Sequence, residues 1–148
     1  MKLSIKNQPI TVLFSLSILA TLLVIASCGE KNDPSPQDVV KAKLSANNWA
    51  LQSVTVDGVD QTTVYQGLTI KFTTTNYTTT NGGVVWPASG TWTFDSTDGK
   101  TIKRDDGLII TVEATDTMLK LTLTWATTTL GGRTGSVGGV HVFSFVKM

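Results

Sequence analysis

Residues 108–125 read LIITVEATDTMLKLTLTW, and this stretch decides the fold. Apolar side chains stand at every second position, first at Leu108, Ile110, Val112 and Ala114 and then at Leu119, Leu121, Leu123 and Trp125. A strict period of two is typical of an antiparallel strand with one face buried and the other in water. Threonine, which fills many of the intervening positions, suits the outer face of such a strand. We therefore predict two amphipathic strands here.

The same alternation recurs along the chain, and turn signals separate the repeats. Asp57-Gly58, Asn81-Gly82, Asp98-Gly99 and Asp106-Gly107 are Asx-Gly pairs, the strongest short-range signal of a β-hairpin. Between these turns we predict strands near residues 49–56, 67–73, 76–80, 90–94, 101–104, 108–114, 118–125 and 140–146. No segment long enough for a crossover helix separates the strands, so the sheet should be antiparallel.

Eight short strands with a single apolar face can form a closed barrel or a two-sheet sandwich. Turns between nearest neighbours favour an up-and-down order, and closing that order into a barrel removes both sheet edges. The predicted fold is therefore all-β, an eight-stranded antiparallel up-and-down barrel, with the sandwich as the alternative. Ahead of it, residues 35–38 (SPQD) are typical of a helix start with Ser35 as the N-cap. We expect a short helix that packs against the barrel.

The first 27 residues have the features of an export signal. Lys2 and Lys6 make a basic start, and residues 10–26 form an uninterrupted uncharged run. The run ends in Ile25, Ala26, Ser27 and Cys28, which resembles the bacterial lipobox. The resemblance implies cleavage before Cys28, a diacylglyceryl group on its thiol and a further acyl chain, such as palmitate, on the new amino group. Several chains are needed because one alone holds a protein on a membrane only marginally.

The chain thus divides into a lipoprotein signal peptide (1–27), a polar tether (28–36) and a barrel domain with its leading helix (37–148). An uncleaved transmembrane helix is the alternative for the apolar run, and the basic flank leaves the domain outside the cytoplasmic membrane in either case. Glu30, Lys31 and Asp33 loosely resemble the signals that send lipoproteins to the cell surface, although a solvated linker explains them equally well. We expect a lipid anchor in the cell envelope, at the outer membrane, on either its periplasmic or its surface face.

Length and charge limit the class of protein. The chain has 148 residues, with 12 Lys+Arg and 11 Asp+Glu. Removing Lys2 and Lys6 with the signal leaves 10 basic against 11 acidic residues. Such a balance excludes nucleic-acid binding by bulk electrostatics, because the phosphate backbone requires a basic surface. The single cysteine also excludes an intramolecular disulfide.

The sequence contains no catalytic constellation, so we predict that the protein is not an enzyme and has neither a cofactor nor a metal site. His141, the only histidine, alternates with Val140 and Val142 as a strand residue does. Ser136 lies in residues 134–138 (TGSVG), which miss the Gly-x-Ser-x-Gly motif at the first position. Most aspartates stand in or beside turns, where the side chain bonds its own backbone, and this explains them better than paired acid–base catalysis.

Several segments of the predicted barrel resemble one family. They are LSANNWALQSVTVDG at 44–58, NYTTTNG at 76–82, SGTWTF at 89–94 and DGK at 98–100. Together they resemble the lipocalin-like lipoproteins of Bacteroidetes-type bacteria, whose members are mostly uncharacterised, over residues 44–147. The resemblance implies a lipocalin-like barrel. One departure is Asn47, which stands where lipocalins have the glycine of Gly-x-Trp.

Two sets of residues are candidates for binding. The apolar face includes Phe72, Trp92, Phe94 and Trp125, which line a ligand site if the interior has room and otherwise pack the core. The glycine-rich residues 131–139 form a predicted loop between the last two strands, with Arg133 as the only charge and the candidate contact to a partner. We therefore expect a non-catalytic envelope lipoprotein that binds an apolar small molecule or a surface partner such as an envelope protein. The alternative is a structural or assembly module with a filled barrel and no small-molecule ligand.

Overall fold

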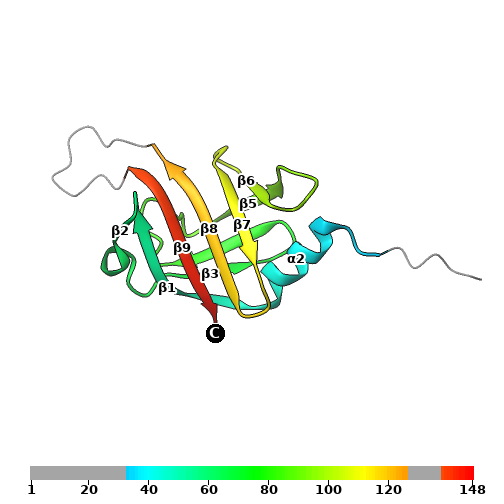
Figure 1. The fold of residues 1–148 in the computed structure, drawn as a ribbon, viewed down its shortest axis with the longest axis horizontal. Coiled ribbons are helices and arrows are strands. Elements are labelled where there is room, and N and C mark those ends of the chain that lie inside the picture. The colour runs from blue at the N-terminus through cyan, green and yellow to red at the C-terminus, as the bar shows by residue number, and fades with distance from the viewer. Residues whose placement is uncertain (1–32, 127–137) are drawn as a thin grey trace, which may run out of the picture. The chain divides into compact units, whose positions relative to one another are not determined.

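The structure is a computed structural model that describes residues 33–126 and 138–148 (Figure 1). Its elements follow the chain in this order: α2 (Pro36–Ala46), β1 (Asn48–Val56), β2 (Val59–Asp60), the 3-10 helix η1 (Thr62–Tyr65), β3 (Thr69–Phe72), β4 (Asn76–Thr80), β5 (Ser89–Phe94), β6 (Thr101–Arg104), β7 (Ile109–Ala114), β8 (Met118–Trp125) and β9 (Gly139–Lys147). The eight predicted strands are present, each within two residues of its predicted bounds. The short β2 and η1 were not predicted.

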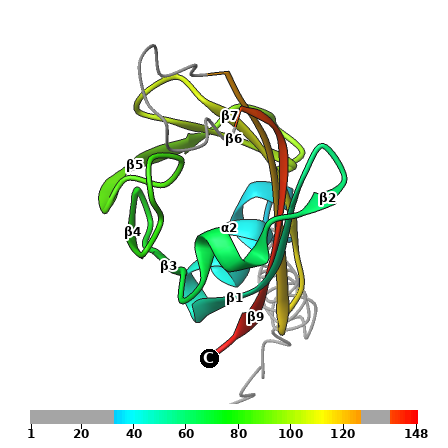
Figure 2. The same ribbon diagram turned by 90° about the vertical axis from the view of Figure 1, so that its left-hand side faces the viewer.

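The strands form one closed antiparallel barrel. Each of β3 to β8 pairs with the next strand along the chain, β1 pairs with β3, and β9 returns to pair with β1 from Trp49–Lys147 to Val56–His141. Strand β2 adds only a two-residue extension beside β1. Figure 2 shows the strands as a ring seen from the end that carries β2. The predicted eight-stranded up-and-down barrel is therefore confirmed, and the sandwich alternative is wrong.

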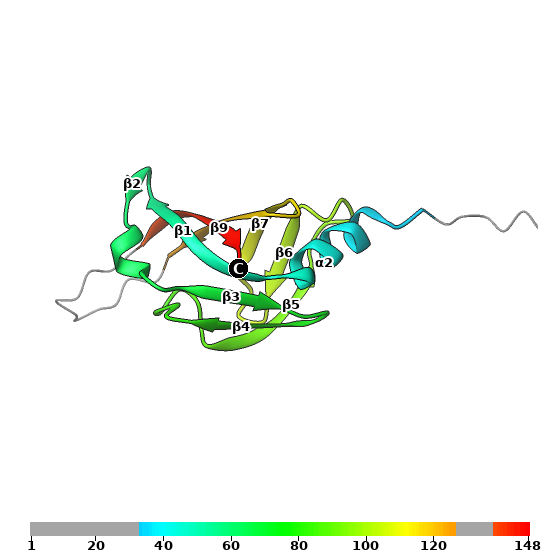
Figure 3. The same cartoon turned by 90° about the horizontal axis from the view of Figure 1, so that it is seen from below.

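Antiparallel neighbours place alternate connections at opposite ends of a barrel. We call one end the helix end, because α2 lies there with the connections 73–75, 95–100 and 115–117. The other is the loop end, formed by residues 57–68, 81–88 and 105–108 together with the ends of β8 and β9. Figure 3 shows α2 and β2 at these opposite ends. The chain therefore enters the barrel domain at the helix end.

Helix α2 begins as the sequence predicts. The Ser35 hydroxyl accepts a hydrogen bond from the Asp38 amide over 3.1 Å and donates one to the Asp38 carboxylate over 2.7 Å. Leu44 is buried, and its carbonyl accepts a bond of 3.0 Å from the Trp49 indole. At the other end of the helix, the Gln37 amide donates to the Ser96 carbonyl over 2.8 Å. These contacts attach the helix to the end of the barrel.

Three of the predicted Asx-Gly pairs, Asp57-Gly58, Asp98-Gly99 and Asp106-Gly107, place their glycine in the left-handed region, whereas at Asn81-Gly82 the positive φ falls on Asn81 and Gly83 and the connection runs over residues 81–88. Asp57 and Gly58 have φ of 48° and 80°, and Gly107 has φ of 86°, a left-handed region that glycine enters without steric cost. The Asp98 carboxylate accepts from the Lys100 amide over 2.9 Å and that of Asp106 from the Leu108 amide over 3.1 Å. The interpretation of these acids as turn residues is borne out by these bonds.

The inward side chains fill the barrel. Large apolar residues with at most 2% exposure come from nearly every strand and from two loop-end segments: Trp49, Tyr65, Leu68, Ile70, Phe72, Tyr77, Trp86, Trp92, Ile102, Ile110, Leu119, Leu121, Phe143 and Phe145. Their alternation with exposed neighbours is the period of two seen in the sequence. Barrels of eight strands have interiors that side chains alone can fill.

Candidate functional site

The four candidate ligand-lining residues do not form one lining. Phe72 and Trp92 are buried in the core, with ring centroids 5.9 Å apart in an edge-to-face arrangement. Phe94 is half-buried at the helix end, with the Lys41 ammonium 5.9 Å from its ring. Trp125 is half-buried where β8 ends, at the loop end. Phe72, Trp92 and Phe94 are thus in contact with one another, since the Trp92 and Phe94 ring centroids are 5.2 Å apart, whereas Trp125 lies at the loop end.

The most unusual inward residue is a charged one. Arg104 ends β6, and only 2% of it is exposed. Its Nη1 donates to the Val85 carbonyl over 2.6 Å, and its Nε donates to the Asp106 carboxylate over 3.1 Å. Nη2 donates to the second oxygen of the same carboxylate. Burying a charge is costly without a partner, and the bidentate carboxylate supplies one.

Three aromatic rings surround the Arg104 guanidinium. Its Cζ lies 5.3 Å from the centroid of Trp86, 5.9 Å from that of Tyr77 and 6.0 Å from that of Trp125. Such cation–π contacts contribute about 0.5–2 kcal/mol each, with the larger value where water is excluded. Trp86 comes from the loop 81–88, so that loop folds its large side chain back into the barrel. We call Arg104, Tyr77, Trp86 and Trp125 the arginine cluster.

Two polar atoms of the arginine cluster lack partners. The Tyr77 hydroxyl and the Trp86 indole nitrogen are buried, and no hydrogen bond to a described residue satisfies either. Leaving such a group unsatisfied costs about 1–3 kcal/mol, and few buried groups in folded proteins remain so. The arginine cluster thus contains the buried side-chain polar atoms of the described barrel that have no hydrogen-bond partner.

A second polar pair lies in the barrel wall near the loop end. His141 is fully buried on β9, and its Nδ1 lies 3.1 Å from the Gly139 carbonyl oxygen. Because a carbonyl only accepts, Nδ1 carries the proton, and Nε2 then accepts from the Tyr65 hydroxyl over 2.9 Å. Burial lowers the pKa of His141 and raises that of Tyr65 to about 12. The pair therefore holds a neutral imidazole and a neutral phenol, and it links η1 to β9.

The surface of the loop end is rich in exposed valine. Val59 on β2, Val64 on η1 and Val84 in the loop 81–88 are 61%, 57% and 70% exposed. Val140, at the start of β9, is 43% exposed. Single exposed apolar residues are ordinary, but these four share one end of the barrel. The loop end thus presents apolar side chains outside the barrel and the arginine cluster within it.

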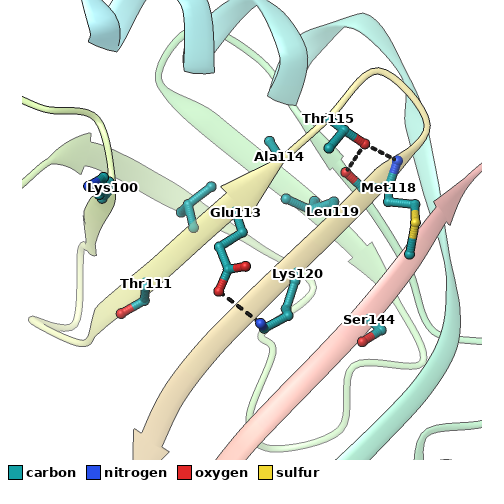
Figure 4. A pocket seen from close by; sticks show the side chains of 10 residues that line it. Lys100, Thr111, Glu113, Ala114, Thr115, Met118, Leu119, Lys120 and Ser144 are labelled. Carbon is teal, nitrogen blue, oxygen red and sulfur yellow. Dashed lines mark hydrogen bonds and ion pairs between the residues drawn. The ribbon is translucent and has the colours of Figure 1, made fainter.

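A groove runs over the outside of the barrel across β7, β8 and β9 (Figure 4). Thr111, Glu113, Lys120 and Ser144 face outward here, and Glu113 forms an ion pair of 2.8 Å with Lys120. Leu119 lies in the same region but points into the barrel (Figure 4). The exposed ion pair between Glu113 and Lys120 contributes little to the stability of the barrel. The outward side chains of its lining place the groove on the outer surface of the barrel.

The other sequence predictions concern metal binding, the membrane and residues near the N-terminus and in the glycine-rich segment. Within the described ranges, no three His, Cys, Asp or Glu side chains gather as they would around a metal ion. None of the helices in residues 33–126 and 138–148 has the length and apolar character needed to cross a membrane. Cys28, its flanking residues 25–27 and the candidate contact Arg133 lie outside the described residues.

Sequence reasoning missed the arginine cluster, although one signal for it existed. Arg104 is two residues from Ile102, so the period of two places both on the inward face. Trp86 gave no such signal, because it lies in an aperiodic segment. Neither the known protein families nor the curated proteins contain a match to this chain.

Proposed function

We propose that the protein is a lipocalin-like envelope lipoprotein, anchored at the outer membrane through acylated Cys28, whose barrel is a non-catalytic module that binds an envelope protein at its loop end. The observation that carries the proposal is the exposure of Val59, Val64 and Val84 at one end of a barrel filled by its own side chains. Exposed apolar side chains gathered in one region are typical of interaction surfaces. The filled interior favours recognition at the surface over carriage of a molecule inside.

The position of the tether supports the same proposal. Residues 28–36 lead into α2, which begins at Pro36 at the helix end. A flexible tether of polar residues and proline attaches the barrel domain at its helix end and leaves the loop end free of the covalent attachment. Its loops are the segments that most often carry binding in a scaffold of this kind.

The proposal is tested by site-specific photocrosslinking in the cells that make the protein. A photoreactive residue at Val64 or Val84 should give one discrete crosslinked product. The same residue at Val39 is the matched control, because Val39 is an exposed valine on α2 at the helix end. Equal products from Val39 and Val84, or none from either, would contradict binding at the loop end.

The anchor is tested separately by the mass of the mature protein. Acylated Cys28 at the new N-terminus is the expected result, and a Cys28→Ser variant should leave the membrane fraction. A mature chain that retains residues 1–27 would support the transmembrane alternative instead. Because crosslinking and mass are independent measurements, either half of the proposal can fail without the other.

A further inference from the structure

We propose that the groove over β7, β8 and β9 is a binding site for a single aliphatic chain with an anionic head group, namely a medium-chain carboxylate. The groove lies on the outer wall of the barrel, so this site is separate from the loop end that we propose for an envelope protein. Its volume is about 660 Å³. Sites for small molecules commonly have volumes of about 300–1,000 Å³, so the groove has room for such a ligand.

The surface of the groove is mostly hydrocarbon. Met118, at the start of β8, is 51% exposed and lines the groove together with the half-buried Ala114 at the end of β7 (Figure 4). The methylene stems of Lys100 and Lys120 add to this surface, since a long charged side chain covers apolar surface while its ammonium stays in water. The groove therefore offers a ligand contacts with its CH₂ groups.

The lining favours an aliphatic chain over a ring. None of the 10 described residues that line the groove is aromatic, so neither a sugar nor an aromatic compound finds a ring on which to stack. Methionine is unbranched and adapts its shape to a flexible ligand. The groove is also elongated. Lys100 accepts a bond of 2.8 Å from the Val112 amide of β7, and Ser144 lies on β9, so the lining spans three strand spacings, or about 14 Å.

The charges of the lining favour an anionic head group. Glu113 and Lys120 form an ion pair of 2.8 Å and neutralise each other, which leaves Lys100 as the remaining charge among the described lining residues. The Lys100 ammonium lies 3.8 Å from the Asp98 carboxylate, which is outside the lining, and the Lys100 side chain is 76% exposed. An exposed contact of this length contributes little. The ammonium at one end of the groove can therefore turn toward a carboxylate.

A ligand in the groove contacts side chains and leaves the backbone of the sheet as it is. The three strands are paired across the groove, with Glu113 opposite Lys120 and Lys120 opposite Ser144. The backbone hydrogen bonds of this ladder need no rearrangement when a chain lies on its outer face. Binding should therefore be detected at side-chain atoms of the groove rather than by amide exchange.

The test follows the methionine methyl signals by NMR, using the whole protein in phospholipid nanodiscs. Octanoate is the probe, Met118 is the reporter, and Met148, which is 69% exposed and outside the groove, is the internal reference. Octanoate should shift the Met118 signal saturably and leave that of Met148 unchanged. Hexanoate should bind roughly four- to sixteenfold more weakly, because each methylene placed on the groove contributes a factor of about two to four.

A matched pair of lysine variants tests the head group. Lys100→Gln should weaken octanoate binding roughly two- to fivefold, the usual value of an exposed ion pair. Lys103→Gln removes a lysine that is exposed on β6 outside the groove, and it should leave octanoate binding unchanged. No saturable shift at Met118, or an equal shift at Met148, would overturn the site. Octylammonium that binds as tightly as octanoate, or unaltered octanoate binding by Lys100→Gln, would overturn the anionic head group.

Discussion

Replacing Arg104 by methionine tests whether the arginine cluster stabilises the barrel. Methionine keeps an unbranched side chain of similar length, so the change removes the guanidinium with little change in apolar volume. The variant loses the bond to Val85, the ion pair with Asp106 and the contacts with three aromatic rings. We expect Arg104→Met to lower the free energy of unfolding.

The magnitude follows from the exposure of the partners. Val85 is fully buried, so its carbonyl loses a partner at about 1–3 kcal/mol. The Asp106 side chain is 42% exposed and can be rehydrated, so loss of the ion pair adds less than about 1 kcal/mol. The ring contacts add about 0.5 kcal/mol each at the lower limit. Relief of the buried charge offsets part of this sum, and we expect a net loss of about 2 kcal/mol.

Equilibrium urea unfolding of the mature protein, followed by tryptophan fluorescence, measures this loss. Lys103→Met is the matched control, because Lys103 is the exposed outward neighbour on the same strand. The control should stay within about 0.5 kcal/mol of the parent protein. A variant Arg104→Met as stable as the parent, or more stable, would refute the reasoning and show that desolvation of the guanidinium outweighs its contacts.

Three further predictions concern other parts of the barrel. Ser35→Ala should lower the free energy of unfolding by about 1 kcal/mol through loss of the helix cap, measured by urea unfolding. Ser45→Ala removes only bonds back to the Lys41 and Ala42 carbonyls within the same helix and should not lower it. Because burial lowers the pKa of His141, the unfolded chain takes up its proton first as the pH falls. The free energy of unfolding should therefore be highest above the ordinary histidine pKa of about 6.5 and should decrease as the pH falls below it. His141→Gln should reduce this dependence of the thermal unfolding temperature on pH. The same pH dependence in the variant would contradict the buried neutral imidazole. Gly90→Ala should displace the Tyr77 hydroxyl and lower the urea midpoint by the equivalent of about 1–3 kcal/mol, and an unchanged midpoint would count against this close contact.

The strands could be predicted because their sequence signal is local. In β6 and β8, side chains alternate between the barrel interior and the solvent, and the predicted bounds 101–104 and 118–125 equal the observed ones. The hairpin turns at Asp57-Gly58 and Asp106-Gly107 could be predicted equally well, because their glycines have a positive φ that few other residues adopt. The order of the turns favoured the up-and-down arrangement, and closure by β1 and β9 was favoured because it removes both sheet edges.

The arginine cluster could not be predicted in the same way. Hydrophobicity rules place arginine in solvent, and Arg104 is buried only because Asp106 and Val85 satisfy its guanidinium after folding. Trp86 enters the interior from the loop 81–88. This loop has no alternating pattern of apolar residues, so the direction of its side chains could not be predicted. Strand β2 was missed because two residues are too few to show alternation.

Hydrogen exchange of the protein in its own envelope membranes, compared with the purified protein in detergent, tests the central claim most directly. That claim is recognition at the loop end of a filled barrel. The account predicts that residues 57–65 and 81–88 gain protection in the membranes, while the exchange of β7, β8 and the outward groove stays the same. Protection that appears along the groove at Thr111 and Ser144, with none at the loop end, would contradict it.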